Sequence, residues 1–244
     1  MSRCFAIATF LAPAAVLLAP AAALAAENGG TVVGQIALDE KRGEPPVRSS
    51  GFVPRTKNAL RPPRPFDPTP HLVIVLEGGT AAPEDTEPPG LAVKLNIIGE
   101  SFDTPVLPVV VGSVVEVQNQ ARNSPRLYCP TAEGLVPGDP INPKGERKTK
   151  KIDKAETAYE IRDRESAHLS GRIVAFPHKY FARVKPDGKF EITGVPAGSW
   201  KVKVWYRDAY LETPVETVQV EAKRPTKPIK LAIPARLPTT ADAR

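Results

Sequence analysis

The stretch HLSGRIVAFPHKYFARVKPDGKFEITGVPAGSWKVKVWY, residues 168–206, decides the fold class. Short β-branched and aromatic runs are separated in it by turn signals such as Pro186-Asp187-Gly188, where Pro presets φ and Gly accepts a positive φ. Residues 199–207 alternate most clearly, with Trp200, Val202, Val204 and Tyr206 on one face and Lys201, Lys203, Trp205 and Arg207 on the other. Period-two alternation is typical of a strand with one buried side and one solvent-facing side.

Other apolar runs outside this stretch predict further strands. The continuous run HLVIVLE, residues 71–77, has the right length for a buried strand, and VVEVQN, residues 114–119, alternates. Further strands are expected at 31–38, 91–98, 106–111, 123–129 and 211–221. With 28 prolines and little helical periodicity, the chain is predicted to be all-β, a sandwich or an open barrel.

Residues 1–26 resemble a secretory signal peptide, with Arg3, then a long apolar run, then small residues before a cleavage site at Ala25 or Ala26. A membrane anchor is the competing interpretation, but Pro13 and Pro20 interrupt the run. No other stretch approaches the roughly 18 apolar residues that span a bilayer. We therefore expect an exported protein, periplasmic or secreted, without a membrane span after cleavage.

The rest of the chain divides by composition. Residues 27–38 are expected as a first strand, 39–70 as a Pro-rich arm, 71–221 as one sandwich, and 222–244 as a basic Pro-rich tail. The arm is either a plain loop or a binding segment.

A second irregular region, 131–156, carries Lys148, Lys150 and Lys151, which form either a solvated surface or a partner-binding loop. The net charge of +6 suits acidic surfaces and does not imply nucleic acid.

Two patterns resemble a known family. The order FDTPVLPVVVGSVVEVQN, residues 102–119, is similar to the approach to the copper site in plastocyanin-like exported proteins of the methylamine-utilisation type. The segments HKYFA (178–182), DGKFEI (187–192) and VPAG (195–198) are similar to the end of the same proteins, and residues 171–207 resemble a carboxypeptidase-regulatory module. The resemblance covers about residues 91–207 and implies a cupredoxin-like Greek-key β-sandwich with long Pro-rich loops.

The resemblance does not extend to the copper ligands. Laid on the family's motif without gaps, the His, Cys, His and Met ligands fall at Pro125, Arg164, Ser166 and Leu169. A blue-copper site needs a thiolate and two imidazoles with a weak axial ligand. The resemblance thus implies the fold without its electron-transfer chemistry, and we expect no copper and no other cofactor.

Three residues are weak candidates for a rebuilt metal site, namely Cys129, His168 and His178. The favoured interpretation of Cys129 is a buried free thiol, since it follows an apolar run and Cys4 leaves with the signal peptide. His178 belongs to the segment that resembles the family's tail, outside the ligand loop.

No enzyme chemistry is indicated. Asp163, Glu165 and His168 lie close together in sequence, but without a second constellation they are interpreted as loop solvation. The chain has no Gly-rich phosphate loop and no His-Glu-x-x-His motif.

We therefore expect a non-enzymatic binding or structural protein whose partner is another envelope or extracellular protein. A copper or redox protein with relocated ligands is one alternative, and a carbohydrate-binding module is another. Trp205, ringed by Lys201, Lys203 and Arg207, is the candidate surface for an acidic or sugar partner. The competing interpretation is that the Pro-rich arm or the tail covers Trp205.

Overall fold

A computed structural model of the chain describes residues 29–37, 67–79, 85–234 and 237. These residues form β-strands and one short 3-10 helix, Thr69–His71, and they contain no α-helix. The expected all-β fold is confirmed. The expected signal peptide and most of the expected Pro-rich arm lie outside the described residues, as does the end of the expected tail. Within the described ranges no helix has the length and apolar character to cross a membrane.

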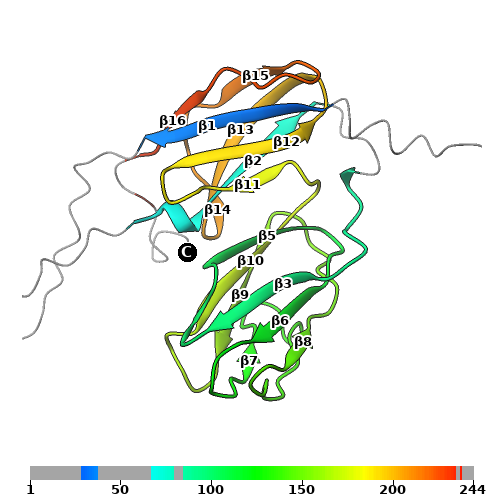
Figure 1. The fold of residues 1–244 in the computed structure, drawn as a ribbon, viewed down its shortest axis with the longest axis vertical. Coiled ribbons are helices and arrows are strands. Elements are labelled where there is room, and N and C mark those ends of the chain that lie inside the picture. Colours follow the sequence, from blue (N-terminus) through cyan, green and yellow to red (C-terminus); the bar gives the residue numbers. More distant parts are fainter. Residues whose placement is uncertain (1–28, 38–66, 80–84, 235–236, 238–244) are drawn as a thin grey trace, which may run out of the picture.

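The described strands build two lobes, one above the other in Figure 1. In the terminal lobe, one sheet has the order β12-β1-β16, and the facing sheet has the order β11-β2-β13-β14 with β15 also paired to β13. The strands are β1 (Gly30–Ala37), β2 (Leu72–Gly78), β11 (Phe181–Arg183), β12 (Lys189–Val195), β13 (Gly198–Tyr206), β14 (Ala209–Tyr210), β15 (Glu216–Val220) and β16 (Ile229–Ala232).

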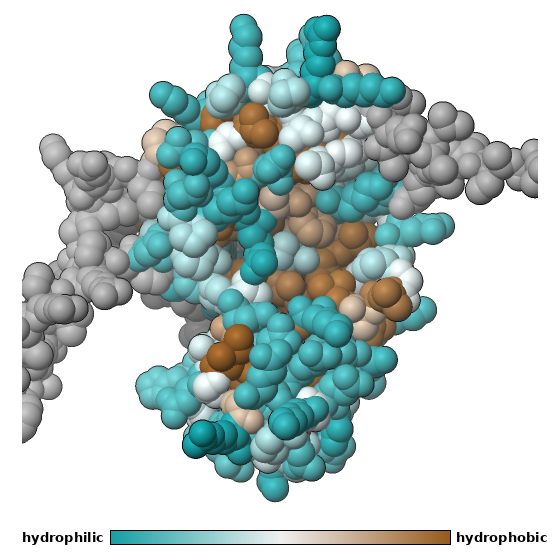
Figure 2. Space-filling model, viewed as in Figure 1, coloured by the Kyte–Doolittle hydropathy of each residue, from teal (hydrophilic) through white to brown (hydrophobic). Residues whose placement is uncertain are grey.

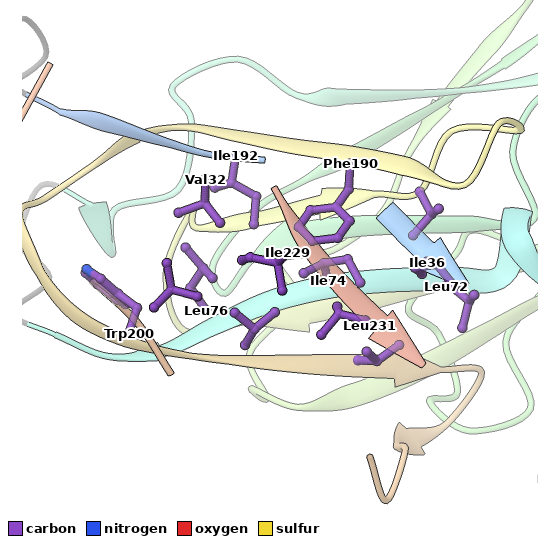
Figure 3. Packing of buried hydrophobic residues seen from close by; sticks show 14 of the residues in the cluster. Val32, Ile36, Leu72, Ile74, Leu76, Phe190, Ile192, Trp200, Ile229 and Leu231 are labelled. Atoms are coloured by element: carbon purple, nitrogen blue, oxygen red, sulfur yellow. The ribbon is translucent and has the colours of Figure 1, made fainter. Parts of the chain in front are cut away.

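Apolar side chains from both sheets of the terminal lobe interdigitate in one core. Figure 3 shows Val32, Phe190 and Ile229 facing Ile74 and Leu76, with Trp200 at one end of the cluster. Trp200 is fully buried, so its assignment to the core-facing side of β13 is confirmed.

The inserted lobe lies between β2 and β11 in sequence. Its two sheets have the orders β4-β3-β6-β8 and β5-β10-β9-β7. The strands are β3 (Val93–Ile98), β4 (Ser101–Phe102), β5 (Val106–Val110), β6 (Val115–Asn119), β7 (Leu127–Tyr128), β8 (Glu146–Lys148), β9 (Thr157–Asp163) and β10 (Ser170–Phe176). A second core, with Leu95, Val117, Ile161 and Ile173 among its members, fills the space between the sheets. This two-sheet arrangement is a β-sandwich, as the resemblance implies, but it ends at β10, and residues 181–206 of the resembling stretch belong to the terminal lobe.

Residues 71–221, expected as one sandwich, supply strands to both lobes. The segment expected as a tail contains β16, which pairs in parallel with β1. Ile229, Leu231 and Ile233 alternate there with polar or small residues and enter the terminal core. A short alternating strand among prolines is hard to recognise because its pairing partner is nearly 200 positions away in the chain.

The lobes meet along an apolar seam formed by Val73, Val75, Val106, Val174, Phe176 and Trp205. The outer face of β2 and β13 supplies one side of the seam, and β5 and β10 supply the other. In Figure 2, apolar residues are visible where the lobes meet, while the visible surface of the inserted lobe is mainly hydrophilic. Because the seam covers the second face of β2, this strand is buried on both sides, as its continuous apolar run predicted.

Two polar contacts cross the edge of the seam. Arg172 Nε of β10 lies 3.0 Å from Asp208 Oδ1 in the turn after β13. The Tyr210 hydroxyl donates to Glu156 Oε1 at 3.0 Å, and burial together with this carboxylate raises the pKa of Tyr210 strongly. The seam thus has the apolar centre and polar edge of a protein interface.

The two chain segments that connect the lobes are also tied together. Asp85, in the first connection, is buried and accepts a hydrogen bond from the Tyr180 hydroxyl in the second. The Lys179 side chain pairs with the same carboxylate, and the Lys179 backbone N–H donates to the Asp85 carbonyl at 3.0 Å. This clamp fixes both crossings beside Trp200, whose ring centroid lies 5.1 Å from that of Tyr180.

The expectation that Trp205 faces solvent or a partner is wrong. Trp205 is 2% exposed, and the Phe176 ring of the inserted lobe meets it edge-on at 5.7 Å. Its indole N–H donates to the Arg207 carbonyl at 3.0 Å. Cover from within is therefore the correct interpretation. Among the described residues, however, the cover comes from the inserted lobe and from Tyr210, and not from the arm or the tail.

Replacing Trp205 tests the seam. We expect Trp205→Ala to lower the free energy of unfolding by about 3–5 kcal/mol, because a large buried aromatic leaves a cavity between two sheets. Leu91→Ala is the matched control, since Leu91 is 84% exposed and its truncation should cost less than about 0.5 kcal/mol. Urea unfolding measures both values. A Trp205→Ala loss as small as the control's would contradict the seam.

Candidate functional site

The inserted lobe carries two loops at the place where the resemblance puts a copper site. Residues 120–126 follow β6, and residues 164–169 connect β9 to β10. Asn119, fully buried at the end of β6, shapes the first loop. Its side-chain N–H groups donate to the carbonyls of Asn123 and Ile141, both at 2.7 Å, and its oxygen accepts from the Ala121 N–H at 2.8 Å.

Asp163, the last residue of β9, joins the two loops. Its Oδ1 accepts the Arg126 backbone N–H at 2.7 Å, and its Oδ2 accepts the Ser166 backbone N–H at 3.0 Å. The Arg164 N–H adds a backbone bond to the Arg126 carbonyl at 3.0 Å. Hydrogen bonds to a carboxylate are stronger than neutral ones, so Asp163 fastens both loops to β9. Asp163 is 6% exposed, so it is a structural group and its interpretation as loop solvation is wrong.

The four positions that correspond to copper ligands lie in or beside these loops. Pro125 and Leu169 are buried, Ser166 is half-buried and Arg164 is exposed. None of these side chains provides a thiolate or an imidazole, and Arg164 brings a fixed positive charge. The donor set therefore does not fit a blue-copper ion.

The weak metal candidates lie in different surroundings. Cys129 is buried in the core of the inserted lobe, with its Sγ 3.2 Å from Thr131 Oγ1. His168 is exposed just before β10, whereas His178 is buried in the connection from β10 to β11. Burial lowers the pKa of His178, whose Nδ1 accepts the Tyr180 backbone N–H at 3.4 Å. Across the described ranges, no three His, Cys, Asp or Glu side chains are grouped as metal ligands.

The cations expected around Trp205 do not surround an exposed ring. Lys203 forms an ion pair with Glu77 at 2.6 Å and lies 4.9 Å from the Tyr210 ring centroid. Arg207 is half-buried in the turn after β13, with a φ of 52°, and its guanidinium lies 5.3 Å from the Tyr206 ring centroid. Lys201 alone of the three is exposed. The structure therefore does not bring Trp205 and these cations together as a binding surface.

The lysines of the second irregular region lie around β8. Lys148 is exposed, and its ammonium lies 3.5 Å from Glu116 on the neighbouring strand β6. The pKa of Glu116 is lowered mainly by a hydrogen bond from the Gln118 side chain. The charge of Lys148 lowers it further. Lys150 and Lys151 are exposed beyond the strand. Their role in binding a partner stays a prediction.

Sequence reasoning missed the strand β9 and the residues that it positions. Tyr159, Ile161 and Asp163 point into the lobe, and Glu160 and Arg162 point outward, so the run TAYEIRD has the period of a strand. Opposite it, the short strand β7 places Tyr128 next to Arg162. The alternation could have been found, but its polar residues and its position after a long irregular region concealed it.

Comparisons with known proteins give only weak structural likenesses. No family model and no curated protein matches the chain. Among solved structures, an oxidized amicyanin variant matches with a TM-score of 0.32 and 15% identity over 43% of this chain and 98% of amicyanin. A reduced variant gives a TM-score of 0.32 and 16% identity over 42% and 97% of the two chains.

Removing the carboxylate of Asp163 tests its role. We expect Asp163→Ala to lower the free energy of unfolding by about 1–3 kcal/mol, because two backbone N–H groups lose a charged acceptor. Glu165→Gln, an exposed neighbour, should change it by less than about 0.5 kcal/mol. Chemical denaturation of both variants provides the comparison, and equal effects would show that Asp163 does not fasten the loops.

The burial of Cys129 leads to a second prediction. In protein that lacks residues 1–26, Cys129 is the remaining thiol, and a thiol reagent should modify it slowly in the folded state and rapidly in guanidinium. The time course of labelling, followed by absorbance, measures the difference. Rapid labelling of folded protein would mean that the thiol is accessible.

Proposed function

We propose that the protein is an exported, non-enzymatic binding or structural protein that uses a cupredoxin-like lobe without copper. The observation that supports this most is the loop pair fastened by Asp163. A carboxylate and backbone N–H groups connect segments that metal ligands would connect in the related fold. The ligand positions hold Pro125, Arg164, Ser166 and Leu169, which together cannot form a thiolate–imidazole set.

Export is the part of this proposal that rests on residues 1–26, which lie outside the described residues. Their charged start, apolar run and small-residue end have the pattern of a cleaved signal peptide. A periplasmic or secreted location follows from this proposal. The partner is proposed to be another protein of the same compartment.

Two further features support a binding or structural role. The seam and the connection clamp hold the lobes as one body, which offers a firm base for surface loops. The exposed aromatic on which a carbohydrate-binding role depended, Trp205, is buried in the seam. Among the acidic, serine and histidine residues near position 165, Asp163 already accepts two backbone N–H groups, which supports a structural role for its carboxylate.

Copper titration tests this proposal. Purified protein from which residues 1–26 have been removed should stay colourless after incubation with Cu(II), because no thiolate–copper pair forms. Cys129→Ser and His168→Ala variants should give the same absorbance spectrum as the parent protein. A strong visible band in the parent that disappears in Cys129→Ser would establish a copper site with relocated ligands and would overturn the proposal.

A further inference from the structure

Four side chains form one exposed face at the far end of the sheet β5-β10-β9-β7. Leu127 lies opposite Asp163 and Tyr128 opposite Arg162, so these neighbours share faces of the β7–β9 pair. One step along, the backbone bond from Arg164 N–H to the Arg126 carbonyl places these two arginines opposite each other. Leu127 and Asp163 point inward, which leaves Arg126, Tyr128, Arg162 and Arg164 on the outer side, here called the arginine face.

The positive charge of this face is only partly compensated. Arg162 pairs with Glu160 at 2.9 Å, and its side chain remains 50% exposed. Arg126 and Arg164 make no ion pair with any described residue, although each is exposed and they lie directly opposite each other. Like charges at opposing positions of a β-ladder are destabilising. This pair of like charges therefore costs stability, and a negatively charged ligand would reduce that cost.

The arginine face is also fixed in place before any ligand arrives. The Asp163 carboxylate binds the backbone of Arg126 and Ser166 from the inner side. On the outer side, the Arg164 guanidinium lies 5.6 Å from the Tyr128 ring centroid, in position for a cation–π contact. A prepositioned guanidinium loses less conformational entropy on binding.

This face continues the surface that the terminal lobe already covers. Val174 and Phe176 on the same side of the sheet enter the seam. Arg172 follows, paired with both Asp208 and Glu160, and Arg162 shares Glu160. The outer side of this sheet thus passes from an apolar, covered half to a basic, exposed half.

We propose that the arginine face binds an acidic, extended segment of a partner protein. Arginine suits carboxylates because its planar fork makes two parallel hydrogen bonds with one carboxylate group. A polypeptide is favoured because β7, in the described part of the chain, pairs only with β9 and ends the sheet, although the Ile141 N–H already bonds the Pro125 carbonyl just before it. An extended segment can lie along this edge and place its Asp or Glu side chains over Arg126 and Arg164. The inference rests on the proposed function only in treating the chain as a binding protein.

Binding of a fluorescent oligoglutamate peptide, followed by anisotropy at several salt concentrations, tests the inference. Arg126→Gln/Arg164→Gln should weaken binding at least about tenfold and flatten its salt dependence. Lys150→Gln/Lys151→Gln removes the same charge from another exposed site and should leave the affinity within about twofold. Thermal unfolding serves as the folding control. The arginine variant loses both the opposed like charges and the contact between Arg164 and Tyr128, which act in opposite directions, so its melting temperature should change little.

Three results would overturn the inference. The parent protein could fail to bind the peptide, or both double variants could lose affinity equally, which would indicate attraction by net charge alone. Polygalacturonate, which carries carboxylates without a peptide backbone, could bind as tightly as the peptide with the same dependence on Arg126 and Arg164, which would assign the face to an acidic glycan. Each of these results leaves the copper titration unaffected, so this inference and the proposed function fail separately.

Discussion

Burial of both faces of the β2–β13 sheet is the constraint on which the rest of the structure depends. Its inner face packs on β1, β12 and β16, and its outer face presents Val73, Val75 and Trp205 to the inserted lobe. Full burial of a large apolar side chain contributes about 1.5–3 kcal/mol, so the terminal lobe alone would leave a costly apolar surface in water. The inserted lobe has its own core, but the outer face of β10 also carries apolar side chains. Val174 and Phe176 on this face would be exposed to water without the terminal lobe. Each lobe supplies the cover that the other requires.

The seam also decides which surfaces remain available for function. It occupies the half of the β5-β10-β9-β7 sheet nearest the terminal lobe and leaves the half around β7 exposed. The clamp of Asp85 with Tyr180 and Lys179 fixes both crossings between the lobes, so the exposed half keeps one position relative to the terminal lobe. The arginine face is therefore a consequence of how the lobes pack.

The local sequence pattern predicts a strand where the buried side chains form an alternating or a continuous apolar run. The apolar run of β2 and the alternation of β13 were both recognised, and Trp200 was placed on the correct face. Trp205 was misplaced because Lys201 and Lys203 gave its face a solvent-exposed pattern. In fact β13 is exposed on that face in its first half and covered in its second, where β10 lies against it. Alternation reports which side chains share a face, but it cannot report what a distant part of the chain places over it.

The candidate site was only partly predictable for a related reason. Position by position, the resemblance locates the two loops and assigns Pro125, Arg164, Ser166 and Leu169 to the family's ligand positions, where none of them offers a thiolate or an imidazole. It could not show that Asp163 fastens the loops, because that role depends on backbone N–H groups in two separate segments. The pairing of Arg126 with Arg164 likewise requires the register of β7 and β9, and β9 had not been recognised.

We propose that hydrogen bonds and packing, without a metal ion, hold this fold together. Calorimetric unfolding of the chain without residues 1–26, before and after exhaustive chelation and again with added Cu(II), tests it most directly. A metal bound at 100 times its dissociation constant adds about 2.7 kcal/mol to the folded state and raises the melting temperature accordingly. We predict one unfolding transition with the same midpoint under all three conditions. A midpoint that falls on chelation and is restored by Cu(II) would contradict the claim.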